Sequence, residues 1–287
     1  MKKIPLVFLA GLLLLITACG GTAPSNPDTA NIETVVAITL QAYTQSAPAA
    51  TAAPSGLSIT VDTLSITIPD GLANGMTVVN EPIAPPADDM PWWGIYPEHK
   101  KFPLQGYLLT GTFHEAEFFI YPANEYAAMN ESVAAKIESL KSILANPSQP
   151  LPERLPFLPT WNAGETFHSN LEVVTFQNGS GIRYLTQYGQ APAPINNHEI
   201  FYTFQGLTSD GTYYIAAVLP ISVPFLTDRG NPESLVPPDG IPFDWDNFMN
   251  NDAHINAITE KLNAADPAVF NPTLPVLDAL IQSVQVK

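Results

Sequence analysis

Carboxylates on predicted strands are the residues whose types and spacing come nearest to a catalytic set. Glu115 and Glu117 stand two residues apart, and Glu172 lies on a later predicted strand. Two carboxyl groups about 5 to 9.5 Å apart that face each other in an open cleft can hydrolyse a glycosidic bond. The sequence alone does not show that the three glutamates share one cleft. Hydrolysis of a cell-wall or extracellular polymer is therefore an alternative function, ranked behind the binding or scaffolding role described below.

Aromatic residues in a proline-rich loop offer a binding site of another kind. Trp92, Trp93 and Tyr96 could stack on a sugar ring or a peptide, although large aromatic residues near prolines more often pack a loop onto the core. Arg183 is one of only three arginines. It could pair with Glu172 across a sheet, which is the favoured interpretation, or recognise the carboxylate of a ligand.

The remaining reactive side chains do not have the spacing of a known motif. The segment His114-Glu115-Ala116-Glu117 lacks the second histidine of a zinc-binding helix. Ser180 falls in a predicted hairpin turn, whereas a hydrolase nucleophile needs a strand-to-helix turn. Asp244 and Asp246 could offer oxygens to calcium, but helix capping explains them without the missing glycine and glutamate of a calcium loop. The sequence therefore predicts no metal site, no cofactor and no catalytic residue.

The only cysteine of the 287 residues stands at the end of a short apolar segment. Two lysines precede an apolar run from Ile4 to Thr17, and this order is typical of a secretory signal. A membrane-spanning helix needs about 20 apolar residues, more than this run supplies. Because an exported chain with one cysteine has no disulfide partner of its own, Cys19 is better explained as an acylation site.

The segment Leu15-Ile16-Thr17-Ala18-Cys19 resembles the lipobox of bacterial lipoproteins. The resemblance implies that a diacylglyceryl group is attached to the sulfur of Cys19 and that a peptidase cuts between Ala18 and Cys19. Two or more acyl chains hold a protein durably on a membrane, because each buried methylene contributes about 0.8 kcal/mol. The expected location is the extracytoplasmic face of a bacterial membrane, with the lipid on Cys19 as the anchor.

Charge narrows the range of partners. The chain has 27 acidic and 11 basic residues, and loss of Lys2 and Lys3 with the leader would take its formal net charge from −16 to −18. Nucleic acids and anionic lipid surfaces require clustered lysine and arginine, so neither is an expected partner. The hydrophobic fraction of 46% is ordinary and sufficient for a core.

Composition divides the chain into three parts. Residues 1–18 are the predicted signal peptide, and residues 19–56 are a predicted lipidated flexible tether rich in Gly, Thr, Ala, Pro, Ser and Asn. Such a tether buries too little surface to offset the entropy of ordering. Residues 57–287 are a predicted single globular domain.

Within that domain, apolar residues recur with a period of two in predicted strands and 3.6 in predicted helices. Strands are expected over 57–61, 64–68, 104–110, 113–121, 167–176, 182–188, 199–206 and 212–219, and helices over 122–145, 244–262 and 274–284. The strand expected over 212–219 is apolar on both faces, which indicates a sheet covered on both sides. The predicted fold class is α+β, with a mainly antiparallel sheet covered by helices.

Two further resemblances concern the domain. The stretches 176–188 (FQNGSGIRYLTQY) and 204–211 (FQGLTSDG) resemble a group of uncharacterised bacterial lipoproteins, which transfers no activity. The order of hairpin, helix, meander and closing helix is similar to that of PsbP-like α/β/α sandwiches. The leading expectation is a surface-tethered, non-enzymatic binding or scaffolding domain, whose protein or glycan partner the sequence does not identify.

Overall fold

A computed structural model describes residues 55–287 of the chain. The predicted signal peptide, the Ala18–Cys19 cleavage and lipidation site, and the tether up to residue 54 lie outside the described residues. The described residues belong to one compact unit. No helix within residues 55–287 has the length and apolar character that crossing a membrane requires.

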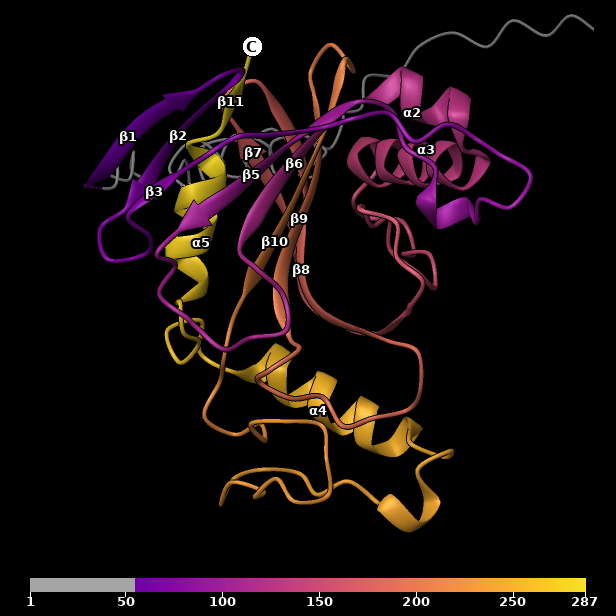
Figure 1. Ribbon diagram of the computed structural model, residues 1–287. Helices are drawn as coiled ribbons and strands as arrows, with labels where there is room; N and C mark the ends of the chain where they lie inside the picture. Colours follow the sequence, from indigo (N-terminus) through magenta and orange to yellow (C-terminus); the bar gives the residue numbers. More distant parts are fainter. Residues whose placement is uncertain (1–54) are drawn as a thin grey trace, which may run out of the picture. The chain divides into compact units, whose positions relative to one another are not determined.

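An antiparallel sheet of eight strands forms the centre of the domain (Figure 1). Its strands follow the order β3 (Gly75–Met76), β5 (His99–Gln105), β6 (Glu117–Pro122), β10 (Tyr213–Pro220), β9 (Phe201–Thr208), β8 (Gly179–Gly189) and β7 (Gly164–Phe176), and β4 (Val79–Glu81) also pairs with β5. The predicted meander is confirmed as β7 to β10. Phe176 pairs with Gly179, so Gln177 and Asn178 form the tight turn of its first hairpin.

A second, smaller sheet contains β1 (Gly56–Val61), β2 (Leu64–Pro69) and β11 (Gln285–Val286). Asp62 takes a positive φ of 54° in the turn between β1 and β2, a conformation that aspartate tolerates better than most residues. The predicted opening hairpin is therefore confirmed. The sequence did not predict β11, because two residues carry no measurable periodicity.

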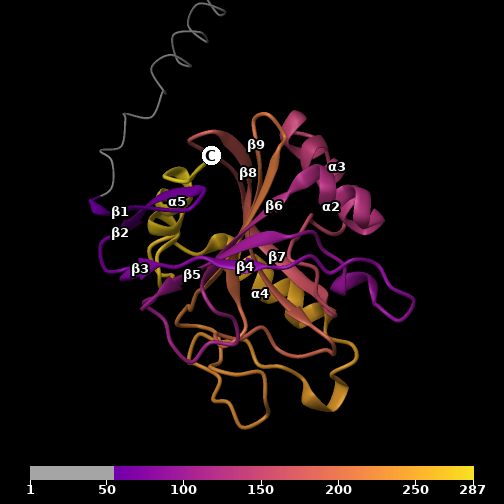
Figure 2. The same ribbon diagram turned by 45° about the horizontal axis from the view of Figure 1, so that its top comes forward.

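Helices cover both faces of the central sheet. Helices α2 (Ala123–Met129) and α3 (Glu131–Ala145) lie on one face, and α4 (Asp252–Ala264) and α5 (Leu274–Gln282) pack with the core on the other (Figures 1 and 2). Strand β10 faces both cores: Tyr214, Ala216 and Val218 belong to the core under α2 and α3, and Ile215, Ala217 and Leu219 to the opposite one. The α+β prediction with a two-sided antiparallel sheet is confirmed.

Two predicted helices have different bounds in the structure. The helix expected over 122–145 divides at Asn130, whose side chain caps α3. The helix expected from Asp244 begins at Asp252, because a separate 3-10 turn, η2 (Trp245–Asn247), precedes it. Several asparagines there favour turns over helix. Asp244 caps that turn, its Oδ1 accepting a hydrogen bond of 3.2 Å from the Asn247 amide.

The two strands expected over 104–121 lie farther apart in the sequence than predicted. Strand β5 ends at Gln105 and β6 begins only at Glu117. Gly106 and Gly111 take positive φ values of 62° and 71°, which interrupt the extended backbone that both strands need. Residues 106–116 therefore form a loop at one end of the sheet.

Candidate functional site

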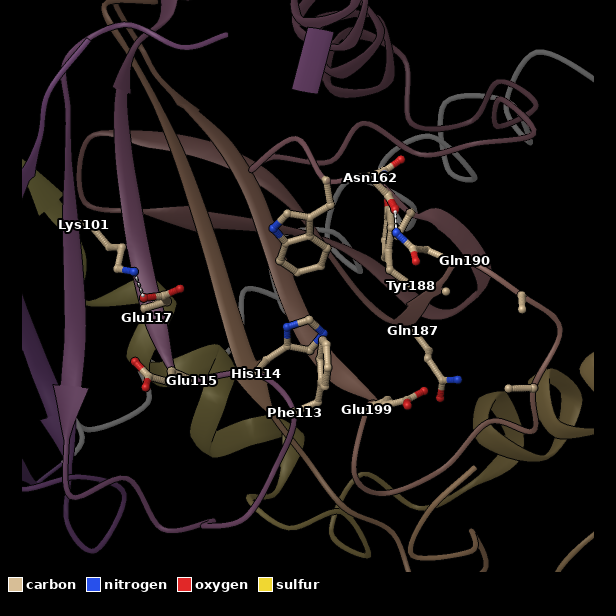
Figure 3. A pocket seen from close by; sticks show the side chains of 15 residues that line it. Lys101, Phe113, His114, Glu115, Glu117, Asn162, Gln187, Tyr188, Gln190 and Glu199 are labelled. Carbon is tan, nitrogen blue, oxygen red and sulfur yellow. Dashed lines mark hydrogen bonds and ion pairs between the residues drawn. The ribbon is translucent and has the colours of Figure 1, made fainter. Parts of the chain in front are cut away.

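A cavity of about 790 Å³ lies at the end of the sheet where β6 begins and β8 ends (Figure 3). Small-molecule sites usually measure about 300–1,000 Å³. Two of its lining residues, Trp161 and Tyr188, also pack against the core under α2 and α3. The cavity therefore opens on the same face as these helices, where the sheet extends past them. The site is built from three groups of side chains.

The first group is an aromatic wall made of Phe113, His114, Trp161 and Tyr188. The rings of His114 and Trp161 are stacked, with centroids 4.7 Å apart and planes 6° from parallel. Phe113 meets His114 edge-on at 4.9 Å, and Tyr188 meets Trp161 edge-on at 5.5 Å. Both stacked and edge-on pairs are favourable aromatic geometries. The wall is therefore held by its own contacts, while Phe113 stays 65% exposed.

His114 brings an unused polar atom to this wall. Its Nε2 is buried and has no hydrogen-bond partner among the described residues. Burial, with a smaller contribution from the nearby His198, lowers the pKa of His114 to about 4. The ring is therefore neutral at pH 7. Because Nε2 is also closed to solvent, His114 presents its ring, and not this atom, to the cavity.

The second group is a set of carboxylates. Glu117 lies 3.1 Å from the ammonium of Lys101, measured from Oε2 to Nζ. Burial raises the pKa of Glu117, and Lys101 opposes that shift. Glu115 is exposed, and Glu199 Oε2 accepts a hydrogen bond of 3.2 Å from the side-chain Nδ2 of Asn196. In the view of Figure 3, Glu115 and Glu117 lie on one side of His114 and Glu199 lies on the other. With one cation among three carboxylates, the cavity disfavours anions.

The third group consists of amides that fix the rim. Gln187 is buried, and its Oε1 accepts a hydrogen bond of 3.0 Å from the Asn196 backbone while its Nε2 donates one of 3.3 Å to Pro194. Gln190 Nε2 donates to the backbone oxygen of Asn162 at 2.7 Å (Figure 3). The loop after β8 is thus tied to the segment before β7. The protein's own bonds hold the cavity open, as in most preformed ligand sites.

Trp92, Trp93 and Tyr96 lie elsewhere, near the junction of α2 and α3. Trp92 and Trp93 form a short 3-10 turn, η1 (Trp92–Gly94), and their rings meet edge-on at 5.8 Å. Thr160 Oγ1 donates a hydrogen bond of 2.8 Å to the Trp93 oxygen. Trp92 is 46% exposed, and Tyr96 packs against the core under the helices. The structure keeps these three aromatic residues together but does not bring them to the cavity.

The junction depends on Asn130. Its Oδ1 accepts hydrogen bonds from the amides of Ser132 (3.1 Å) and Val133 (3.4 Å), and its Nδ2 donates to the Trp92 oxygen at 2.8 Å. We expect Asn130→Ala to lower the free energy of unfolding by about 2 kcal/mol, since a cap and a buried hydrogen bond contribute about 1 kcal/mol each. Asn130→Ser keeps a capping oxygen without placing a charge against the Trp92 oxygen, and it should lose less. Urea unfolding of the two variants measures the difference, and equal losses would contradict the capping role.

Arg183 and Glu172 lie on the opposite face of the sheet. Ile182 and Tyr184, the neighbours of Arg183, belong to the core under α2 and α3, so Arg183 points toward α5. Its Nη2 lies 2.9 Å from Glu172 Oε2, and its Nε lies 3.2 Å from Asp278 Oδ1 on α5. The predicted pairing of Arg183 with Glu172 is confirmed. Of the three glutamates singled out in the sequence, the cavity receives Glu115 and Glu117 but not Glu172.

The sequence did not reveal the aromatic wall as a site. Its members come from the loop before β6, the segment before β7 and the end of β8, so no local spacing relates them. The described part of the chain has no group of three or more His, Cys, Asp or Glu residues that could hold a metal ion.

Comparison with known proteins yields no matching protein family, no matching curated protein and no matching solved structure. The resemblances to lipoproteins and to PsbP-like sandwiches therefore stay predictions. Function has to be argued from the cavity itself.

Proposed function

We propose that this chain is a lipid-anchored, extracytoplasmic, non-enzymatic binding protein whose domain takes a neutral saccharide into the cavity behind the aromatic wall. The observation that carries the proposal is a set of stacked and edge-on aromatic rings that lines one preformed cavity together with carboxylates.

A saccharide matches both properties of this wall. The C–H face of a sugar ring is apolar and packs on aromatic rings, whose faces carry the negative part of the quadrupole. The hydroxyl edge can bond to the carboxylates of Glu115 and Glu199, which line the cavity. A purely apolar ligand would leave these polar groups unpaired, at a cost of about 1–3 kcal/mol each. An anionic ligand would meet three carboxylates.

The anchor completes the proposal. A short apolar leader that ends in the only cysteine supports lipidation of Cys19. The excess of acidic residues gives the chain no attraction to an anionic surface, so the lipid has to supply the attachment. A tether over residues 19–56 gives the domain reach from the membrane.

Glycan binding tests the proposal. The full-length chain in detergent is applied to an array of neutral, anionic and cationic glycans that includes β-1,4-linked oligomers of N-acetylglucosamine and of glucose. We expect neutral glycans to bind and anionic ones to fail. In titration calorimetry, Phe113→Ala should weaken binding about 5- to 30-fold, since truncating an aromatic anchor removes about 1–2 kcal/mol.

Phe248→Ala is the matched control, because Phe248 is a 43% exposed phenylalanine that does not line the cavity. Its affinity should equal that of the unaltered chain. Failure of every neutral glycan to bind, or equal binding by the Phe113→Ala variant, would overturn the proposal.

A hydrolase that acts on an envelope or extracellular polymer is the second candidate. Burial raises the pKa of Glu117, as a general acid requires, and Glu115 lines the same cavity. Chromatography of the incubated glycan separates the two functions. Release of shorter chains that stops in Glu117→Gln, with binding retained, would replace the non-enzymatic interpretation by this one.

A further inference from the structure

A second cavity, of about 400 Å³, lies against the loop 106–116. His114 and Glu115 line this cavity and also line the larger one with the aromatic wall. The two cavities therefore share these two residues in their linings. Glu115 is exposed at this junction, where its carboxylate can accept hydrogen bonds from either side.

We infer that the two cavities form one path for an extended neutral oligosaccharide, in which one sugar unit rests on the aromatic wall and later units follow the loop 106–116. The inference rests on the proposed function and deepens it, since it replaces a single sugar by a chain of several units. Each cavity falls within the size range of about 300–1,000 Å³ that is usual for small-molecule sites, so each has room for a unit of its own.

The second cavity has the chemistry of a continuing sugar chain. Its only acidic or basic side chains besides His114 are those of Glu115, and Thr110, Thr112 and Gln105 supply uncharged polar groups. Apart from His114, its one aromatic residue is Tyr107, which is buried and whose hydroxyl donates to the Pro220 oxygen at 2.9 Å. This part of the path therefore offers hydrogen bonds and little stacking.

The loop also leaves space along the path. Gly111 takes a positive φ of 71°, and no atom lies within 4 Å of the position that a side chain there would occupy. Thr110 beside it is exposed. Because Thr110 is exposed and lines the second cavity, a bulky residue at position 110 would occupy that cavity.

Chain-length dependence tests the inference. Titration calorimetry of the full-length chain uses β-1,4-linked oligomers of N-acetylglucosamine and of glucose, from one to six units. We expect at least a tenfold gain in affinity between the single unit and the longer oligomers of the series that binds. Thr110→Trp should remove that gain, so that long oligomers bind no better than short ones.

Leu108→Trp is the matched control, because Leu108 lies on the same loop, is 50% exposed and does not line the second cavity. It should keep the gain. Equal affinity for one unit and for six, with no effect of Thr110→Trp, would overturn the extended path and leave the proposed function standing. Absence of binding at every length would overturn both.

Discussion

Replacing Arg183 by methionine should lower the free energy of unfolding by about 3–5 kcal/mol at pH 7, because removing one partner of a buried ion pair leaves an uncompensated charge. The Arg183 side chain is only 4% exposed and contacts Glu172, Asp278 and the backbone oxygen of Asn170. Asp278 Oδ1 also accepts a hydrogen bond of 2.9 Å from Tyr202. This network joins β7, β8 and β9 to α5, so its loss should be felt by the whole domain.

The dependence on pH identifies the cause of that loss. Burial raises the pKa of Asp278, and Arg183 opposes that shift. Without Arg183 the pKa of Asp278 should rise further above its unfolded value. The buried carboxyl then takes up a proton as the pH falls, and the difference from the unaltered chain should shrink in acid.

Urea unfolding followed by circular dichroism measures these effects on the full-length chain. Glu172→Gln should cost no more than about 1 kcal/mol, since Glu172 is 63% exposed and a pair with an exposed partner contributes little. Arg154→Met is the matched control for an exposed arginine and should change nothing measurable. A loss below about 1 kcal/mol in Arg183→Met would contradict a stabilising network.

Replacing Cys19 by alanine should abolish lipidation completely. In the unaltered chain we expect radioactive palmitate to be incorporated, and mass spectrometry to find Cys19 as the first residue with at least two acyl chains. The Cys19→Ala chain should carry no label and keep residues 1–18, because the resemblance to a lipobox makes cleavage dependent on the lipidated cysteine. Two acyl chains hold a protein durably on a membrane, whereas one holds it marginally. Membrane attachment should therefore be complete in the unaltered protein and absent in Cys19→Ala.

A cysteine at another position provides the control for this experiment. Thr51→Cys in the Cys19→Ala chain restores a single cysteine outside the lipobox-like segment, and it should not restore the label. Label in either cysteine variant, or an unmodified Cys19 in the native chain, would contradict the anchor.

Several features of the fold could be predicted because short stretches of sequence determine them. The alternation on both faces of the strand at 212–219 predicted a two-sided sheet, and β10 does pack against two cores. The two-residue turn at Gln177 and Asn178 fixes the register of β7 and β8 near the turn, which is why pairing of Arg183 with Glu172 could be predicted. Asp278 could not be predicted as a partner, since it comes from a helix far along the chain.

The cavity with the aromatic wall could not be predicted either, because its residues are also far apart in the sequence. Trp161 and Tyr188 come to lie beside His114 only after β6, β10, β9 and β8 have paired in that order, and the loop 106–116 exists because two glycines interrupt the predicted strands. Trp92 and Trp93 were conspicuous because they are adjacent in sequence, yet the structure places them at the junction of α2 and α3. Sequence reasoning detects neighbours along the chain, whereas this cavity is formed by residues that only tertiary packing unites.

Oxidative footprinting of the four tryptophans tests the central claim most directly. The full-length chain is oxidised with and without a saturating amount of the oligomer that binds most tightly, and each tryptophan is quantified by mass spectrometry. We expect protection of Trp161 alone, with Trp92, Trp93 and Trp245 oxidised as before. Protection of Trp92 or Trp93 while Trp161 stays reactive would move the ligand to the α2–α3 junction and contradict binding at the aromatic wall.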